Sequence, residues 1–185
     1  MNSAERFFLP ENQPISDLSH TICHLYICGY MNEVQSLVFN HLFQSLQSIT
    51  IGCHCFVEAR EFVIDSVSCL ELVKIGYECF NIDEEEREDG FFRIHNCPTL
   101  SHLEIGNNSF QDFKFFEVSH VNSLQSIRFG NTCFEYADCS LKGELSHWKC
   151  VGGGVDYELN WKQIHEERVW WWSWCRSSII GNGYI

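Results

Sequence analysis

Four copies of one seven-residue pattern constrain the fold of this chain more than any other feature. Each copy reads Leu-x-x-apolar-x-apolar-Gly, and the copies begin at Leu46, Leu70, Leu100 and Leu124. The starting points are therefore 24, 30 and 24 residues apart. A Phe stands four residues beyond each Gly, at Phe56, Phe80, Phe110 and Phe134. Self-similarity at a nearly fixed interval is typical of an array of like units.

Apolar residues within each copy alternate with the period of two that a β-strand requires. A second apolar pair follows in each interval, at Phe62 and Ile64, Phe92 and Ile94, and Phe116 and Val118. One unit cannot bury its own apolar residues, so neighbouring units should stack about 4.8 Å apart with their strands parallel. We therefore expect a β-rich repeat solenoid of stacked coils of about 24 residues, with little regular helix. Its neighbouring parallel strands should include residues 49–51, 73–75, 103–105 and 127–129.

These motifs resemble the leucine-rich repeat family, whose core reads Leu-x-x-Leu-x-Leu-x-x-Asn-x-Leu. The Gly-x-x-small-Phe ending is most similar to the BspA-like subtype, and the resemblance covers about residues 22–145. The chain departs from the family at the Asn position, which holds His54, Glu78, Asn108 and Thr132. A Gly recurs instead where each strand ends, which indicates either a turn that needs glycine's backbone freedom or close stacking of the coils.

The chain contains 11 Cys, and three of them share one repeat position. Cys55, Cys79 and Cys133, together with Ser109, stand immediately before the repeat Phe, where a small side chain should be needed for packing. An odd number of Cys spread through apolar stretches is typical of reduced thiols, so we expect a cytoplasmic protein. Cys53-His54-Cys55 lacks a second ligand pair at zinc-finger spacing, so no metal or other cofactor is expected.

Charge and motif content narrow the classes of function. The chain has 12 Lys plus Arg against 25 Asp plus Glu, a net charge of −13, which argues against nucleic acid and anionic membranes as partners. No apolar run approaches the roughly 20 residues that span a bilayer. The sequence contains no P-loop, no Gly-x-Ser-x-Gly and no His-Glu-x-x-His, so we do not expect an enzyme.

The x positions of the repeats should form the exposed face of the first strands, and we expect a protein partner to bind there. The resemblance places a partner on this face, and the candidate partner-binding residues are Tyr26, Leu72, Lys74, His102, Glu104 and Arg128. Charges in the row Lys74, Glu104 and Arg128 alternate in sign, so these residues could instead serve only to attract stacked strands. The function we expect is a non-catalytic protein–protein interaction module. The alternative is a fragment of a secreted or cell-surface structural or adhesion repeat array.

Three segments follow from these patterns. Residues 1–21 should form an N-terminal lead-in or cap, and residues 22–145 the repeat array. An insertion at residues 81–90 carries six acids and one Arg, and is either a solvated loop or a docking loop for a basic partner. Residues 146–185 hold all six Trp and form a tail of uncertain order. This tail is a cap over the last coil, a separate interaction segment or sequence of another origin.

Overall fold

The computed structural model describes residues 6–9, 15–29, 31, 33–82, 90–134, 137–142, 149–152 and 155–157, and its strands form two sheets. The first sheet has eight strands, all parallel except for the last pair, β12 and β13. In spatial order these are β1 (Arg6–Leu9), β2 (His24–Ile27), β4 (Ser48–Ile51), β6 (Leu72–Ile75), β8 (His102–Ile105), β10 (Ser126–Phe129), β12 (Lys149–Gly152) and β13 (Val155–Tyr157).

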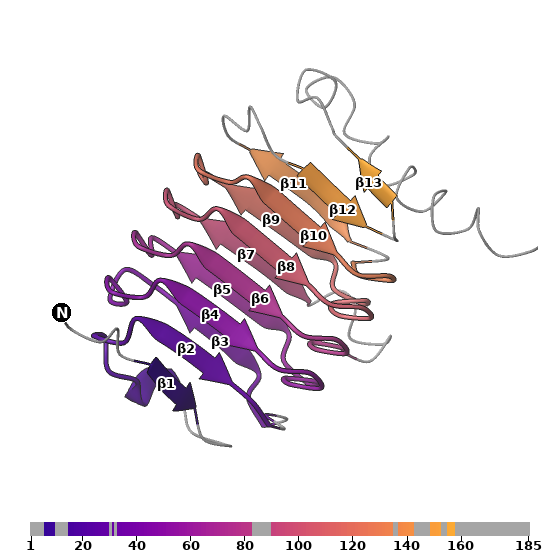
Figure 1. Ribbon diagram of the computed structural model, residues 1–185. Helices are drawn as coiled ribbons and strands as arrows, with labels where there is room; N and C mark the ends of the chain where they lie inside the picture. The colour runs from indigo at the N-terminus through magenta and orange to yellow at the C-terminus, as the bar shows by residue number, and fades with distance from the viewer. Residues whose placement is uncertain are drawn as a thin grey trace, which may run out of the picture.

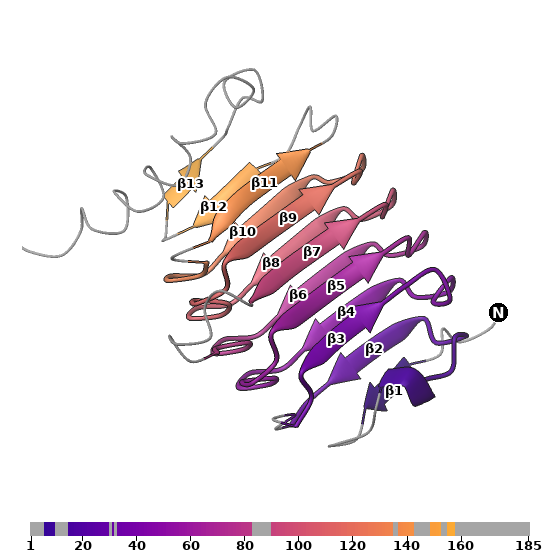
Figure 2. The same cartoon turned by 180° about the vertical axis from the view of Figure 1, so that it is seen from behind.

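The second sheet has five parallel strands, each of which lies in the sequence between two strands of the first sheet. They are β3 (Ser36–Phe39), β5 (Glu61–Asp65), β7 (Phe91–His95), β9 (Phe115–Ser119) and β11 (Asp138–Lys142). The views from front and back show both sets of strands following one another in chain order along the molecule (Figures 1 and 2). Among the described residues, helix is confined to the 3-10 turn η1 (Ile15–Asp17).

Strand formation follows the alternation of apolar residues. In β4 the side chains of Ile49 and Ile51 are buried, whereas Ser48 and Thr50 are only partly so. The register pairs Ile49 with Val73, and the same parallel pairing continues through β8 to β10. The expected parallel strands at residues 49–51, 73–75, 103–105 and 127–129 are thus confirmed.

Two ladders of stacked Phe rings fill the core. The Phe56, Phe80, Phe110 and Phe134 rings are nearly parallel, with successive centroids 5.2, 4.5 and 5.0 Å apart. The ladder from the second sheet, Phe62, Phe92 and Phe116, has spacings of 4.9 and 5.1 Å. Rings of the two ladders meet edge to face, for example Phe92 and Phe110 at 5.1 Å and 83°. Both arrangements are favourable for aromatic pairs, and they tie neighbouring units together across the core.

The repeat glycines are explained by close backbone approach. A Cβ built on Gly76 would lie 2.6 Å from the carbonyl carbon and oxygen of Gly52, and one built on Gly106 would meet Gly76 in the same way. These glycines do not have positive φ angles; the left-handed residues lie two and four positions further on, at His54 (57°) and Phe56 (59°) in the first copy. Of the two explanations that the sequence left open, the structure therefore selects stacking.

The strand pairing extends beyond the expected repeat boundaries at both ends. Strand β1, within the expected N-terminal lead-in, pairs with β2, and Leu9 and Leu18 are buried in the core. Strand β12 pairs with β10 past residue 145. The acidic insertion falls between β6 and β7, and its residues 83–89 lie outside the described part of the chain, as does the tail after residue 157.

Candidate functional site

The outward side chains of the eight-stranded sheet form two rows, which together we call the open face. Because side chains alternate along a strand, residues between the buried ones point away from the core. The strand register aligns one row across β2 to β10, consisting of His24, Ser48, Leu72, His102 and Ser126. It aligns a second row across β1 to β10, consisting of Phe8, Tyr26, Thr50, Lys74, Glu104 and Arg128. All six residues expected from the sequence to bind a partner lie on this face.

A charged cluster occupies one end of the second row. Glu104 lies between two cations, with Lys74 Nζ 3.1 Å from its Oε2 and Arg128 Nη1 3.6 Å from its Oε1. The side chains of Lys74 and Arg128 remain 56 % and 61 % exposed, against 28 % for Glu104. Exposed ion pairs of this kind contribute only about 0–1 kcal/mol each to stability. The cluster therefore has a net charge of +1, and its two ion pairs contribute little to the stability of the fold.

A stacked aromatic pair, with Phe8 exposed and Tyr26 half-buried, occupies the other end of the same row. The rings of Phe8 and Tyr26 stack with centroids 5.0 Å apart and planes at 21°, and Phe8 is 65 % exposed. Phe7 and Leu9 on either side of it contact or enter the core, so Phe8 is the outward residue of β1. Phe8 was missed from the sequence because its segment carries no copy of the repeat. Phe7-Phe8-Leu9 is a continuous apolar run, so it does not indicate which of the three residues faces outward.

The first row is polar apart from Leu72. His24 Nδ1 lies 2.8 Å from Ser48 Oγ, and His102 Nδ1 lies 2.7 Å from Ser101 Oγ. Leu72 is half-buried between Ser48 and His102 on the neighbouring strands. The open face thus offers one aliphatic contact beside the charged cluster and hydrogen-bonding groups along its length.

The five-stranded sheet has an outer face of its own, which sequence reasoning did not consider. Phe91 and Phe115 are paired in register, and Phe115 is 43 % exposed. A cation lies against each ring, with Arg93 Cζ 4.9 Å from the Phe91 centroid and Lys114 Nζ 5.8 Å from that of Phe115. Arg93 also pairs with Glu117 at 3.0 Å. This face supplies matched control positions for the open face.

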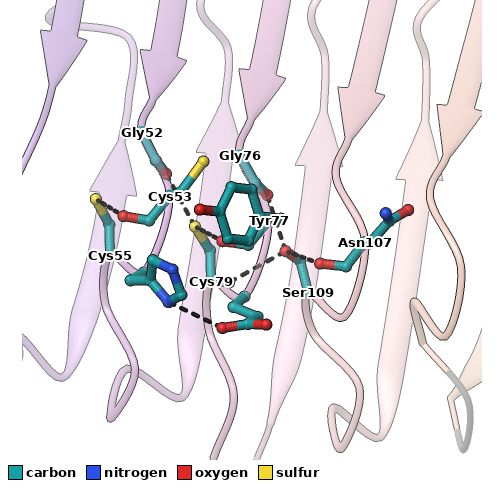
Figure 3. A network of polar contacts seen from close by, with 10 residues as sticks. Gly52, Cys53, Cys55, Gly76, Tyr77, Cys79, Asn107 and Ser109 are labelled. Atoms are coloured by element: carbon teal, nitrogen blue, oxygen red, sulfur yellow. Dashed lines mark hydrogen bonds and ion pairs between the residues drawn. The ribbon is translucent and has the colours of Figure 1, made fainter.

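Small residues before the repeat Phe form a hydrogen-bonded ladder at one edge of the stack (Figure 3). Cys79 Sγ donates to the carbonyl of Gly52 at 3.0 Å, and Ser109 Oγ donates to that of Gly76 at 2.9 Å. Cys133 Sγ repeats the contact to Gly106 at 2.9 Å. The expectation that these are packing residues was therefore incomplete, since Cys79, Ser109 and Cys133 each also form a hydrogen bond to the preceding unit.

The ladder requires protonated thiols. Burial raises the pKa of Cys133 to about 11, and a hydrogen bond with Cys55 together with burial raises the pKa of Cys79. Cys79 and Cys133 therefore keep the protons that they donate to glycine carbonyls, whereas the hydrogen bond with Cys79 lowers the pKa of Cys55 to about 7. Within the described ranges, no group of three or more His, Cys, Asp or Glu side chains could hold a metal ion. In the same part of the chain, no helix is long and apolar enough to cross a membrane.

Comparison with known proteins gives no independent assignment. No protein-family model matches the chain, and neither the curated proteins nor the solved structures contain a match.

Proposed function

We propose that this chain is a short solenoid of the leucine-rich repeat kind, BspA-like, which works as a non-catalytic protein-interaction module in the cytoplasm. Stacked coils of about 24 residues are supported by the strand register. His24 pairs with Ser48 and Ser48 with Leu72, in each case 24 residues apart. Between them, the chain contributes one strand to the second sheet. Leu72 and His102 are 30 residues apart, six more than the other pairs, and the acidic residues 81–90 lie between them in the sequence.

Exposed Phe8, stacked on half-buried Tyr26 in one row with two exposed cations, is the observation that carries the functional proposal. A Phe that is 65 % exposed leaves apolar area in water, and a partner that covered it would gain about 25 cal/mol for each Å² buried. Aromatic residues and Arg are also the types that contribute most at protein interfaces. The row is held on hydrogen-bonded strands, so a partner would find these side chains already aligned.

Replacing Arg128 with Glu should weaken capture of the partner from a cell lysate by at least about tenfold, since interface hot spots contribute 2 kcal/mol or more. Arg93→Glu is the matched control, because Arg93 also pairs with one Glu but lies on the other sheet. Affinity capture with the full chain, quantified for both variants after circular dichroism has shown that they fold, provides the measurement. An unchanged set and amount of captured proteins with Arg128→Glu would rule out the open face as the binding surface.

A further inference from the structure

We propose that the partner of the open face is an acidic protein segment that crosses the strands. Its carboxylates would engage Lys74 and Arg128, and an apolar side chain would cover the Phe8–Tyr26 pair. This inference rests on the proposed function and specifies the chemistry of the partner.

The first argument is charge. Lys74 and Arg128 share one carboxylate, Glu104, and each keeps more than half of its side chain exposed. Each cation therefore has room to accept a second carboxylate without losing the first. Glu104 is covered from both sides and is poorly placed to attract a basic ligand. Glu71, the acidic residue nearest to Lys74 in the sequence, precedes β6 and belongs to neither row.

The second argument is the contrast with the rest of the chain. The molecule carries −13 overall, so an acidic segment is repelled by most of its surface. The cluster of Lys74, Glu104 and Arg128 reverses that sign locally. Within the two rows from β2 to β10, Lys74 and Arg128 are the only Lys or Arg residues, so an acidic partner of the open face would gain its favourable charge contacts there. A long polyanion such as a nucleic acid would have to approach the surrounding acidic surface as well.

The third argument is spacing. Neighbouring strands lie about 4.8 Å apart, so Lys74 and Arg128, two strands apart, are separated by about 9.6 Å along the row. A peptide in the polyproline II conformation advances about 3.1 Å per residue with three residues per turn, so carboxylates three residues apart lie on one face and match this distance. Tyr26 lies two strands beyond Lys74 in the other direction. The matching segment therefore reads apolar-x-x-acid-x-x-acid.

A direct test uses a fluorescent peptide, Ser-Phe-Ser-Ser-Glu-Ser-Ser-Glu-Ser, titrated against the full chain by anisotropy. Glu104→Gln removes the carboxylate that competes for both cations and should tighten binding about three- to fivefold. The double variant Lys74→Gln/Arg128→Gln should weaken it at least about tenfold, and Arg93→Gln on the other sheet should leave it unchanged. Raising the salt concentration should weaken binding to the wild-type chain. A purely structural role for the cluster predicts no gain with Glu104→Gln.

Three results would overturn the proposal. The first is that the peptide does not bind at concentrations up to about 2 mM. The second is that a peptide with both Glu replaced by Gln binds equally well. The third is that neither Glu104→Gln nor Lys74→Gln/Arg128→Gln changes the affinity for the peptide. Failure of this inference is distinguishable from failure of the proposed function. If Arg128→Glu abolishes capture of a partner whose binding segment is neutral or basic, the open face stands and the acidic chemistry is wrong. If Arg128→Glu leaves capture unchanged, the proposed function itself fails.

Discussion

Phe110→Ala is expected to lower the free energy of unfolding by about 4 kcal/mol, the middle of the range for buried Phe truncations. Its ring is fully buried and stacks on Phe80 at 4.5 Å and on Phe134 at 5.0 Å. It also meets Phe92 and Phe113 edge to face. Because the ring joins three successive units, its removal leaves a cavity that no single neighbour can fill. Urea unfolding followed by far-ultraviolet circular dichroism measures the change.

The control for this substitution is Phe115→Ala on the outer face of the second sheet, where the ring is 43 % exposed. That change should cost less than about 1 kcal/mol, since the ring lies at the surface and its removal leaves no enclosed cavity. Since a domain is typically stable by only 5–15 kcal/mol, Phe110→Ala can approach complete unfolding. Phe110→Leu, which keeps more of the volume, then gives an intermediate value. Equal effects of Phe110→Ala and Phe115→Ala would contradict a core built on the Phe ladders.

Gly106→Ala is expected to destabilise the chain by about 3 kcal/mol, the upper end of the usual range for overpacking. The new Cβ would lie 2.6 Å from the carbonyl carbon and oxygen of Gly76, which belong to the backbone of the preceding unit. The backbone can relieve this clash only by separating strands that are hydrogen-bonded to one another, since Gly106 N–H itself donates to Ile75 O at 2.9 Å. The measurement is the midpoint of urea unfolding at constant slope.

Gly52→Ala is the matched control, because Gly52 occupies the same repeat position at an earlier unit. Its Cβ would approach no atom closer than 3.4 Å, the distance to Ile27 O. We expect the free energy of unfolding to change by no more than about 1 kcal/mol. Alanine lowers the backbone entropy of the unfolded chain, and this effect acts in the stabilising direction. If both variants were equally destabilised, contact between stacked units could not be the reason for the glycines.

Much of the fold could be predicted from the sequence because the same pattern, weak in any one copy, recurs in four copies. The recurring unit, together with the alternation inside it, placed Ile49 and Val73 on neighbouring parallel strands and the Phe residues in the core, as the structure shows. The hydrogen bonds from Cys79 and Ser109 to glycine carbonyls could not be predicted. They depend on the distance between units, which the sequence does not encode at a single position.

The candidate site was predictable only where it coincides with the repeat. Lys74 and Glu104 follow from their shared position in successive copies, and the structure places them 3.1 Å apart. Phe8 lies outside the repeat, so its place in the same row depends on tertiary pairing of β1 with β2. Phe115 directly precedes buried Phe116, and two consecutive Phe residues do not indicate which of them is exposed.

Site-specific photo-crosslinking tests the central claim, that a partner binds the open face of the eight-stranded sheet, most directly. A benzophenone side chain introduced at Tyr26 reports on the open face, and one at Phe115 reports on the outer face of the other sheet. Irradiation of the full chain in lysate should give a covalent protein adduct from position 26, and that adduct should disappear when Arg128→Glu is added. An adduct from position 115 with none from position 26 would contradict the account.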